Sequence, residues 1–183
     1  MLIFSLFFFG VRTMWKYKHY KNDETVEIET IRIKEFIKRV MAKMSNNEPL
    51  TEAEQLIFKN SVNVRLAVAN QSLYLHELSE DWSSVVRMAV AKNINTPVDL
   101  LYKLADDEDP MVRACVASNR NTPVDLLLKL ANDKSWVVRM YVAENDNTPI
   151  DVVEKLTEDK EWAVSHSAKL FLSARTSGKN KKP

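Results

Sequence analysis

The sequence predicts an all-α protein, an α-solenoid of short two-helix repeats of about 26 residues each, with capping helices at its N-terminal end. The first observation is a Val-Arg dipeptide that returns at a fixed spacing. The second is an Asn-Thr-Pro-x-Asp segment that follows three of these dipeptides. The third is composition: only 2 Gly and 6 Pro occur among 183 residues, which argues against a turn-rich β fold and favours helices.

The repeat is defined by its Val-Arg pairs, whose second residues are separated by 22, 26, 26 and 26 positions. The pairs, with Val-Ser in the last copy, are Val64-Arg65, Val86-Arg87, Val112-Arg113, Val138-Arg139 and Val164-Ser165. Units of this length cannot bury their own apolar stripe, so neighbouring units must stack to form a core. The spacing therefore predicts consecutive stacked units.

Each unit is expected to contain two helices. The first follows a Thr-Pro pair, with Thr as N-cap, Pro at the first helical position and an acid at the third, as in Thr96 and Asp99. Thr122 and Thr148 stand at the equivalent positions. The second helix follows a cap such as Asp109 before Pro110 and ends at Asn119.

An Asp stands six residues before the Arg in three units, and we expect these side chains to form a ladder through the stack. Its members are Asp81, Arg87, Asp107, Arg113, Asp133 and Arg139. An Arg on an apolar helix face needs a carboxylate and carbonyl partners, because an unpaired buried charge costs several kcal/mol. The alternative is a row of arginines that binds phosphate; the matched Asp favours the structural role. At the last unit Asp159 faces Ser165, so the ladder is expected to end there.

The motifs Asp-x5-Arg, Val-Arg-x2-Val-Ala-x-Asn and Asn-Thr-Pro-x-Asp-Leu-Leu, over about Asn60 to Phe171, resemble the leucine-rich repeat variant family and, more broadly, HEAT-like repeats. The resemblance implies a right-handed superhelix of paired short helices, the second partly 3₁₀. An iron–sulfur module found beside some repeats of this family does not transfer, because the chain has a single cysteine. HEAT-like bacterial DNA glycosylases share the architecture, but the basic concave face that they use is not evident here.

Residues 23–60 are expected to form the N-terminal cap of repeats that span 61–173. An apolar stripe with helical spacing, from Ile33 to Met44, predicts an amphipathic helix. Thr51 with Glu54 predicts a capping box for a second helix through Phe58. The alternative is that the amphipathic helix docks on a partner.

The two ends of the chain are basic. Residues 1–22 begin with the apolar run Met1–Val11, which is too short to span a membrane as a helix. Three interpretations stay open: a start codon assigned too early with Met14 as the true start, a weak membrane-surface anchor over residues 1–21, or an apolar extension of the first helix. Residues 174–183 are expected to be a basic disordered tail.

A candidate partner-binding patch comes from variable positions on the second helices of the last two units. Trp136 and Met140, like Trp162 and His166, lie four residues apart and so share a helix face. Such a patch could anchor a peptide or protein. The alternative, favoured by the usual place of aromatic residues at helical spacing, is that the rings fill gaps between repeats.

The sequence indicates neither a catalytic site nor a metal or cofactor site. The 3 His are scattered, Cys115 is alone, and 2 Gly allow no phosphate loop. Residues 44–163 carry a net charge of −8, which disfavours a nucleic-acid groove along the repeats. We therefore expect a monomeric, cytoplasmic, non-catalytic scaffold that binds a protein or peptide. The alternative is a nucleic-acid-binding HEAT-like protein related to DNA glycosylases.

Overall fold

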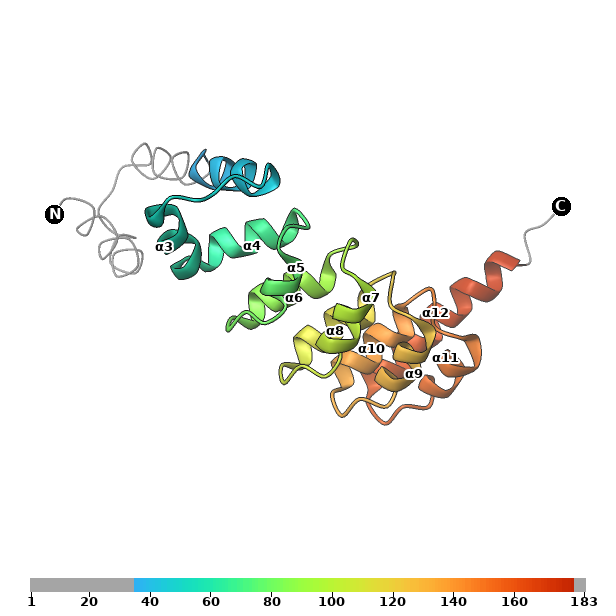
Figure 1. Ribbon diagram of the computed structural model, residues 1–183. Helices are drawn as coiled ribbons and strands as arrows, with labels where there is room; N and C mark the ends of the chain where they lie inside the picture. The colour runs from blue at the N-terminus through green and yellow to red at the C-terminus, as the bar shows by residue number, and fades with distance from the viewer. Residues whose placement is uncertain (1–34, 180–183) are drawn as a thin grey trace, which may run out of the picture. The chain divides into compact units, whose positions relative to one another are not determined.

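The computed structural model describes residues 35–179 of the chain, with the side chains of 177–179 left aside. These residues belong to two compact parts of the chain, which are divided after Leu50. Every regular element among the described residues is a helix, and no strand occurs there (Figure 1). No helix within 35–179 has the length and apolar character needed to cross a membrane.

The N-terminal part contains one described helix, over 35–45. Val40 and Met44 are its buried side chains, as the predicted apolar stripe requires. Residues 1–34, with the apolar run and most of the basic segment, lie outside the described residues. The capping role of this helix therefore stays a prediction.

The C-terminal part, from Thr51, begins with α3 (Glu52–Asn60) and α4 (Val62–Asn70). The predicted capping box at Thr51 is confirmed: its backbone N–H donates to the Glu54 carboxylate at 2.9 Å, and the Glu54 N–H donates to the threonine hydroxyl at 3.3 Å. The helix runs two residues beyond the predicted end at Phe58.

Two sets of helices alternate along the rest of the chain (Figure 1). We call α4 and its equivalents the Val-Arg helices; the others are α6 (Ser84–Lys92), α8 (Pro110–Ser118), α10 (Trp136–Glu144) and α12 (Trp162–Lys179). The short helices between them are α5 (Leu75–Leu78), α7 (Val98–Leu104), α9 (Val124–Leu130) and α11 (Ile150–Leu156). Both sets recur at equivalent positions of the aligned sequence.

The core lies between these helices. Each Val-Arg helix packs on the next one, and each short helix packs on the Val-Arg helix before it and the one after it. Val86 and Val90 of α6 are fully buried, as are their equivalents Val112 and Val116 of α8. Leu101 is the corresponding buried residue of α7. A short helix would be marginal alone, so its stability comes from this packing.

The predicted N-caps Thr96, Thr122 and Thr148 are wrong. The Thr96 hydroxyl donates to the Val90 carbonyl at 2.5 Å, and Pro97 takes the N-cap position of α7. Thr122 and Thr148 make the same bond to Val116 and Val142. These threonines are almost fully buried, and their hydroxyls satisfy carbonyls at the end of the preceding helix. The acid of the first turn, such as Asp99, keeps its place at the positive end of the helix.

The C-terminal end is helical farther than predicted. α12 continues through Lys179, so residues 174–179 are not a disordered tail; 180–183 lie outside the described residues. Arg175 donates to the carbonyls of Thr148 and Asn145 at 2.7 and 2.8 Å. These bonds hold α12 against the last Asn-Thr-Pro turn.

Candidate functional site

The arginines of the Val-Arg helices are held inside the stack. The Arg113 guanidinium donates from Nε and one terminal nitrogen to both oxygens of Asp133, at 2.7 and 2.9 Å. Its other terminal nitrogen donates to the Asp107 carbonyl at 2.7 Å. The side chains of Arg113 and Asp133 are 6% and 9% exposed, which leaves no donor of the guanidinium open to a ligand.

The pairing differs from the one that the six-residue spacing predicts. Each arginine binds the carboxylate that precedes the next Val-Arg helix. For Arg87, Arg113 and Arg139, the Asp six residues earlier supplies a backbone carbonyl instead. The carboxylate pairs are Arg65–Asp81, Arg87–Asp107, Arg113–Asp133 and Arg139–Asp159. Sequence reasoning did not include Arg65 in the ladder, although its Val-Arg dipeptide marks it. Asp159 is the acceptor of the last pair, because Ser165 has no guanidinium to extend the ladder.

The ladder shifts the acidity of its members. Burial raises the pKa of the Asp133 carboxyl, but hydrogen bonds from Arg113 and from the Ser135 backbone outweigh it and hold this pKa below its ordinary value. At Asp159 the hydrogen bond from Arg139 is the largest influence, and it also lowers the pKa. Both carboxylates are therefore charged at neutral pH, and their contacts with Arg113 and Arg139 are ion pairs.

A second ladder, of asparagines, joins the turns between helices. The Asn119 amide donates to the carbonyls of Ala91 and Asn93 in the preceding unit, at 2.8 and 2.9 Å. Asn145 repeats this arrangement one unit later, toward Ala117 and Asn119. Sequence reasoning used these asparagines only to mark the helix ends. Their recurrence in every Val-Ala-x-Asn-x-Asn-Thr-Pro segment was the signal for an inter-unit role.

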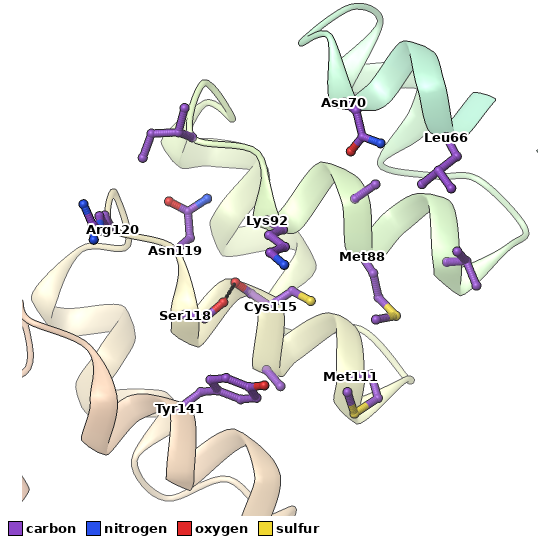
Figure 2. A pocket seen from close by; sticks show the side chains of 14 residues that line it. Leu66, Asn70, Met88, Lys92, Met111, Cys115, Ser118, Asn119, Arg120 and Tyr141 are labelled. Carbon is purple, nitrogen blue, oxygen red and sulfur yellow. Dashed lines mark hydrogen bonds between the residues drawn. The ribbon is translucent and has the colours of Figure 1, made fainter. Parts of the chain in front are cut away.

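The surface of the Val-Arg helices contains a groove of about 630 Å³. It crosses α4, α6, α8 and α10, and Figure 2 shows Met88, Lys92 and Cys115 directed into it, with Tyr141 from the next helix beside them. The described residues that line it are Leu66, Asn70, Val85, Met88, Ala89, Lys92, Ile94, Met111, Ala114, Cys115, Ser118, Asn119, Arg120 and Tyr141. We refer to this set as the groove.

The groove has an apolar edge and a polar edge. Val85 and Met111 lie at the starts of α6 and α8 and are 51% and 40% exposed. Lys92, Ser118 and Arg120 lie at the ends of the same helices or in the turn that follows. The groove is therefore amphipathic across its width.

Cys115 is half-buried in the middle of the groove. Burial raises the pKa of its thiol, while the positive charge of Lys92 opposes that shift and the negative charge of Asp109 adds to it. The thiol is therefore protonated at neutral pH and contributes an apolar surface to the groove.

We call the predicted partner-binding patch the tryptophan patch; its residues are Trp136, Met140, Trp162 and His166. None of these four residues lines the groove. Trp162 is 74% exposed and stacks on His166 with ring centroids 4.7 Å apart, and Trp136 is 44% exposed. Met140 is half-buried. The favoured interpretation, in which the rings fill gaps between repeats, is wrong for Trp162, because its ring is largely open to solvent.

Met140 and His166 nevertheless occupy the positions of α10 and α12 that correspond to Met88 in α6. The tryptophan patch thus continues the row of side chains that forms the groove. Groups of three or more His, Cys, Asp or Glu side chains able to hold a metal do not occur among the described residues.

No protein-family model matches the chain, and no curated protein matches it. A solved structure described as a leucine-rich repeat variant with a novel repetitive protein structural motif is similar to it at 19% sequence identity, over 73% of this chain and 80% of that chain, with a TM-score of 0.31. At this level of similarity no function is transferred to the chain.

Proposed function

We propose that this chain is a non-catalytic helical-repeat scaffold that binds a protein or peptide partner along its Val-Arg helices. The observation that carries the proposal is the groove, which presents exposed apolar side chains from successive helices. Val85, Ile94 and Met111 are each at least 40% exposed, around the half-buried Met88. Contiguous apolar surface of this kind is typical of an interaction site.

The side chains of the groove suit a peptide more than a small molecule. Methionines adapt their shape to different partners, and Met88 and Met111 both line the groove. The groove is open along the stack and draws on several helices, so an elongated partner would contact more of it than a compact one.

The two ladders support the proposal, because they fix the helices that carry the groove. Because the Arg–Asp pairs and the asparagines fix one helix against the next, the side chains of the groove stand on a rigid base. A preorganised surface loses less conformational entropy when it binds. The exposed Trp136 and Trp162 provide anchors for a partner that extends past α8.

For the architecture, we propose a right-handed α-solenoid with units of about 26 residues, of the leucine-rich repeat variant or HEAT-like type, present as a monomer in the cytoplasm. The recurrence of both helix sets at equivalent positions supports the repeat. The single cysteine suits a reducing compartment.

A peptide-display selection on the immobilised full chain tests the proposal. We expect enriched peptides whose binding is lost in Met88→Glu, which places a charge in the groove, and kept in Leu128→Glu, which places one on the exposed face of α9. Circular dichroism of both variants checks that they remain folded. Peptides that bind both variants equally would contradict the groove as the site.

The tryptophan patch is tested in the same assay with a Trp136→Ala/Trp162→Ala double variant. Both side chains are exposed, so the fold should survive the change. A folded double variant that keeps full binding of the selected peptides would remove the patch from the proposal. A gel-shift series tests the nucleic-acid alternative, for which binding must appear at low salt and fall steeply as salt rises.

A further inference from the structure

We infer that the partner is an acidic amphipathic peptide segment, whose carboxylate side chains meet Lys92 and Arg120 while its apolar side chains lie on Met88 and Met111. The inference rests on the proposed function and specifies the chemistry of the ligand. It follows from the separation of the groove into two edges.

The two charged side chains that line the groove, Lys92 and Arg120, are both cations, and Arg120 also borders an adjoining hollow lined by Glu144 and Asp146. Lys92 and Arg120 are exposed, and neither forms an ion pair among residues 35–176. The lining contains no carboxylate among the residues described. This pair of cations stands in a segment, 85–163, whose net charge is −4. A local positive edge on an acidic surface selects for a carboxylate at that edge and against cationic partners.

The two cations lie on the side of the groove formed by helix ends. Lys92 is in the last turn of α6, and Arg120 is in the turn after α8, so they stand at successive units of the stack. Ile94, in the turn after α6, is an apolar residue on this polar side. A bound segment that runs along the stack would therefore place its carboxylates toward the turns.

The opposite side is formed by Val85 and Met111, at the starts of the same helices. Leucine, methionine or aromatic side chains of the bound segment would be buried here. The required ligand thus has apolar residues along one side and Asp or Glu along the other, as an amphipathic segment does.

Two basic segments near the ends of this chain do not have that chemistry. Residues 12–21 contain Arg12, Lys16, Lys18 and Lys21, and residues 169–183 contain five basic residues and no acid. Both segments would be repelled by Lys92 and Arg120. The charge of the groove therefore favours an acidic partner and disfavours these two basic segments as its occupant.

Fluorescence anisotropy with two labelled peptides tests the inference on the full chain. The peptides share one pattern of leucines at i, i+3, i+4 and i+7, and carry either Glu or Lys at the remaining positions. We expect the Glu peptide to bind and the Lys peptide to bind at least about tenfold more weakly. Equal binding of the two peptides would overturn the inference.

Variants then locate the charge effect. Lys92→Glu/Arg120→Glu should weaken the Glu peptide about tenfold and strengthen the Lys peptide, whereas Lys169→Glu, an exposed lysine of α12 outside the lining, should leave both unchanged. A Glu peptide that binds the double variant and the parent equally would contradict the inference.

The outcomes for charge and for the groove are distinguishable. If Met88→Glu abolishes binding of both peptides while charge reversal changes neither, the proposed function stands and the acidic partner is wrong. If Met88→Glu and the charge reversal both leave binding intact, the groove itself is wrong. Light scattering of the free chain should show a monomer; a dimer that the Glu peptide dissociates would assign the groove to a second copy of the chain and overturn the inference.

Discussion

The Arg113 guanidinium and the Asp133 carboxylate form a two-point pair between consecutive units, with N–O distances of 2.7 and 2.9 Å. Both side chains are more than nine-tenths buried. The same guanidinium holds the Asp107 carbonyl at 2.7 Å. One side chain thus fixes the helix–helix contact and the turn that precedes it.

Removal of one partner of this pair should be strongly destabilising. We expect Arg113→Met to lower the free energy of unfolding by about 3–5 kcal/mol, because Asp133 is left charged in a buried site. Urea denaturation followed by circular dichroism measures the change. The matched control is Lys129→Gln, which breaks the exposed pair with Asp106 and should cost no more than about 1 kcal/mol. A similar small cost for both variants would contradict a buried role for the ladder.

The ladder also predicts how stability depends on pH. The native pKa values of Asp107, Asp133 and Asp159 lie below the ordinary carboxyl value of 3.8, so their contribution is complete above that value and is lost as pH falls through the native pKa. Urea midpoints should be level between pH 7 and pH 5 and fall below about pH 4.

Asp133→Asn provides the comparison for this pH profile. The variant is less stable at neutral pH, and its stability should fall less steeply on acidification, because one fewer carboxylate takes up a proton on unfolding. Parallel profiles for the variant and the parent would show that Asp133 does not contribute to the pH dependence.

The asparagine ladder predicts a second class of destabilising change. Asn119→Ala leaves the buried carbonyls of Ala91 and Asn93 without their side-chain donor, and we expect a loss of about 1–3 kcal/mol. Asn132 is the control, because its amide bonds to the Leu128 carbonyl at an exposed site. Asn132→Ala should change the unfolding free energy by less than about 0.5 kcal/mol. Thermal unfolding of both variants compares them directly.

The single cysteine reports on the groove. Burial raises the pKa of the Cys115 thiol, so its alkylation by iodoacetamide should be slow at neutral pH and should reach half its maximal rate above pH 9.0. Lys92→Gln removes a charge that lowers this pKa and should move the profile to higher pH. A profile that stays in place would show that Lys92 does not act on the thiol. The urea-unfolded chain gives the reference rate.

The sequence predicted the helices and the members of the ladder more successfully than their partners. The fixed position of Arg87, Arg113 and Arg139 on an apolar face already indicates that each needs a carboxylate. The spacing suggests the Asp six residues earlier, yet the structure uses the Asp twenty residues later. The earlier Asp lies in the turn before the same helix, where its carbonyl, and not its side chain, meets the guanidinium.

The role of the threonines and the presence of the groove could not be predicted from local sequence either, because both depend on contacts between helices. A Thr-Pro pair before an acid is a common helix start, and only burial of Thr96 against α6 turns its hydroxyl toward Val90. The groove depends on how successive Val-Arg helices stack, which no single segment encodes. The variable positions of the aligned units indicate the tryptophan patch, and Met140 and His166 do fall in the row that continues the groove.

The pairing of Arg87, Arg113 and Arg139 with an Asp twenty residues later makes these three junctions chemically interchangeable. Deletion of one block of 26 residues, such as 105–130, would bring Arg87 opposite Asp133, and the junction would be rebuilt from residues already present. Duplication of a block works in the same way. A gene of this design can therefore gain or lose whole units without a compensating mutation, and the number of stacked Val-Arg helices can change in single evolutionary steps.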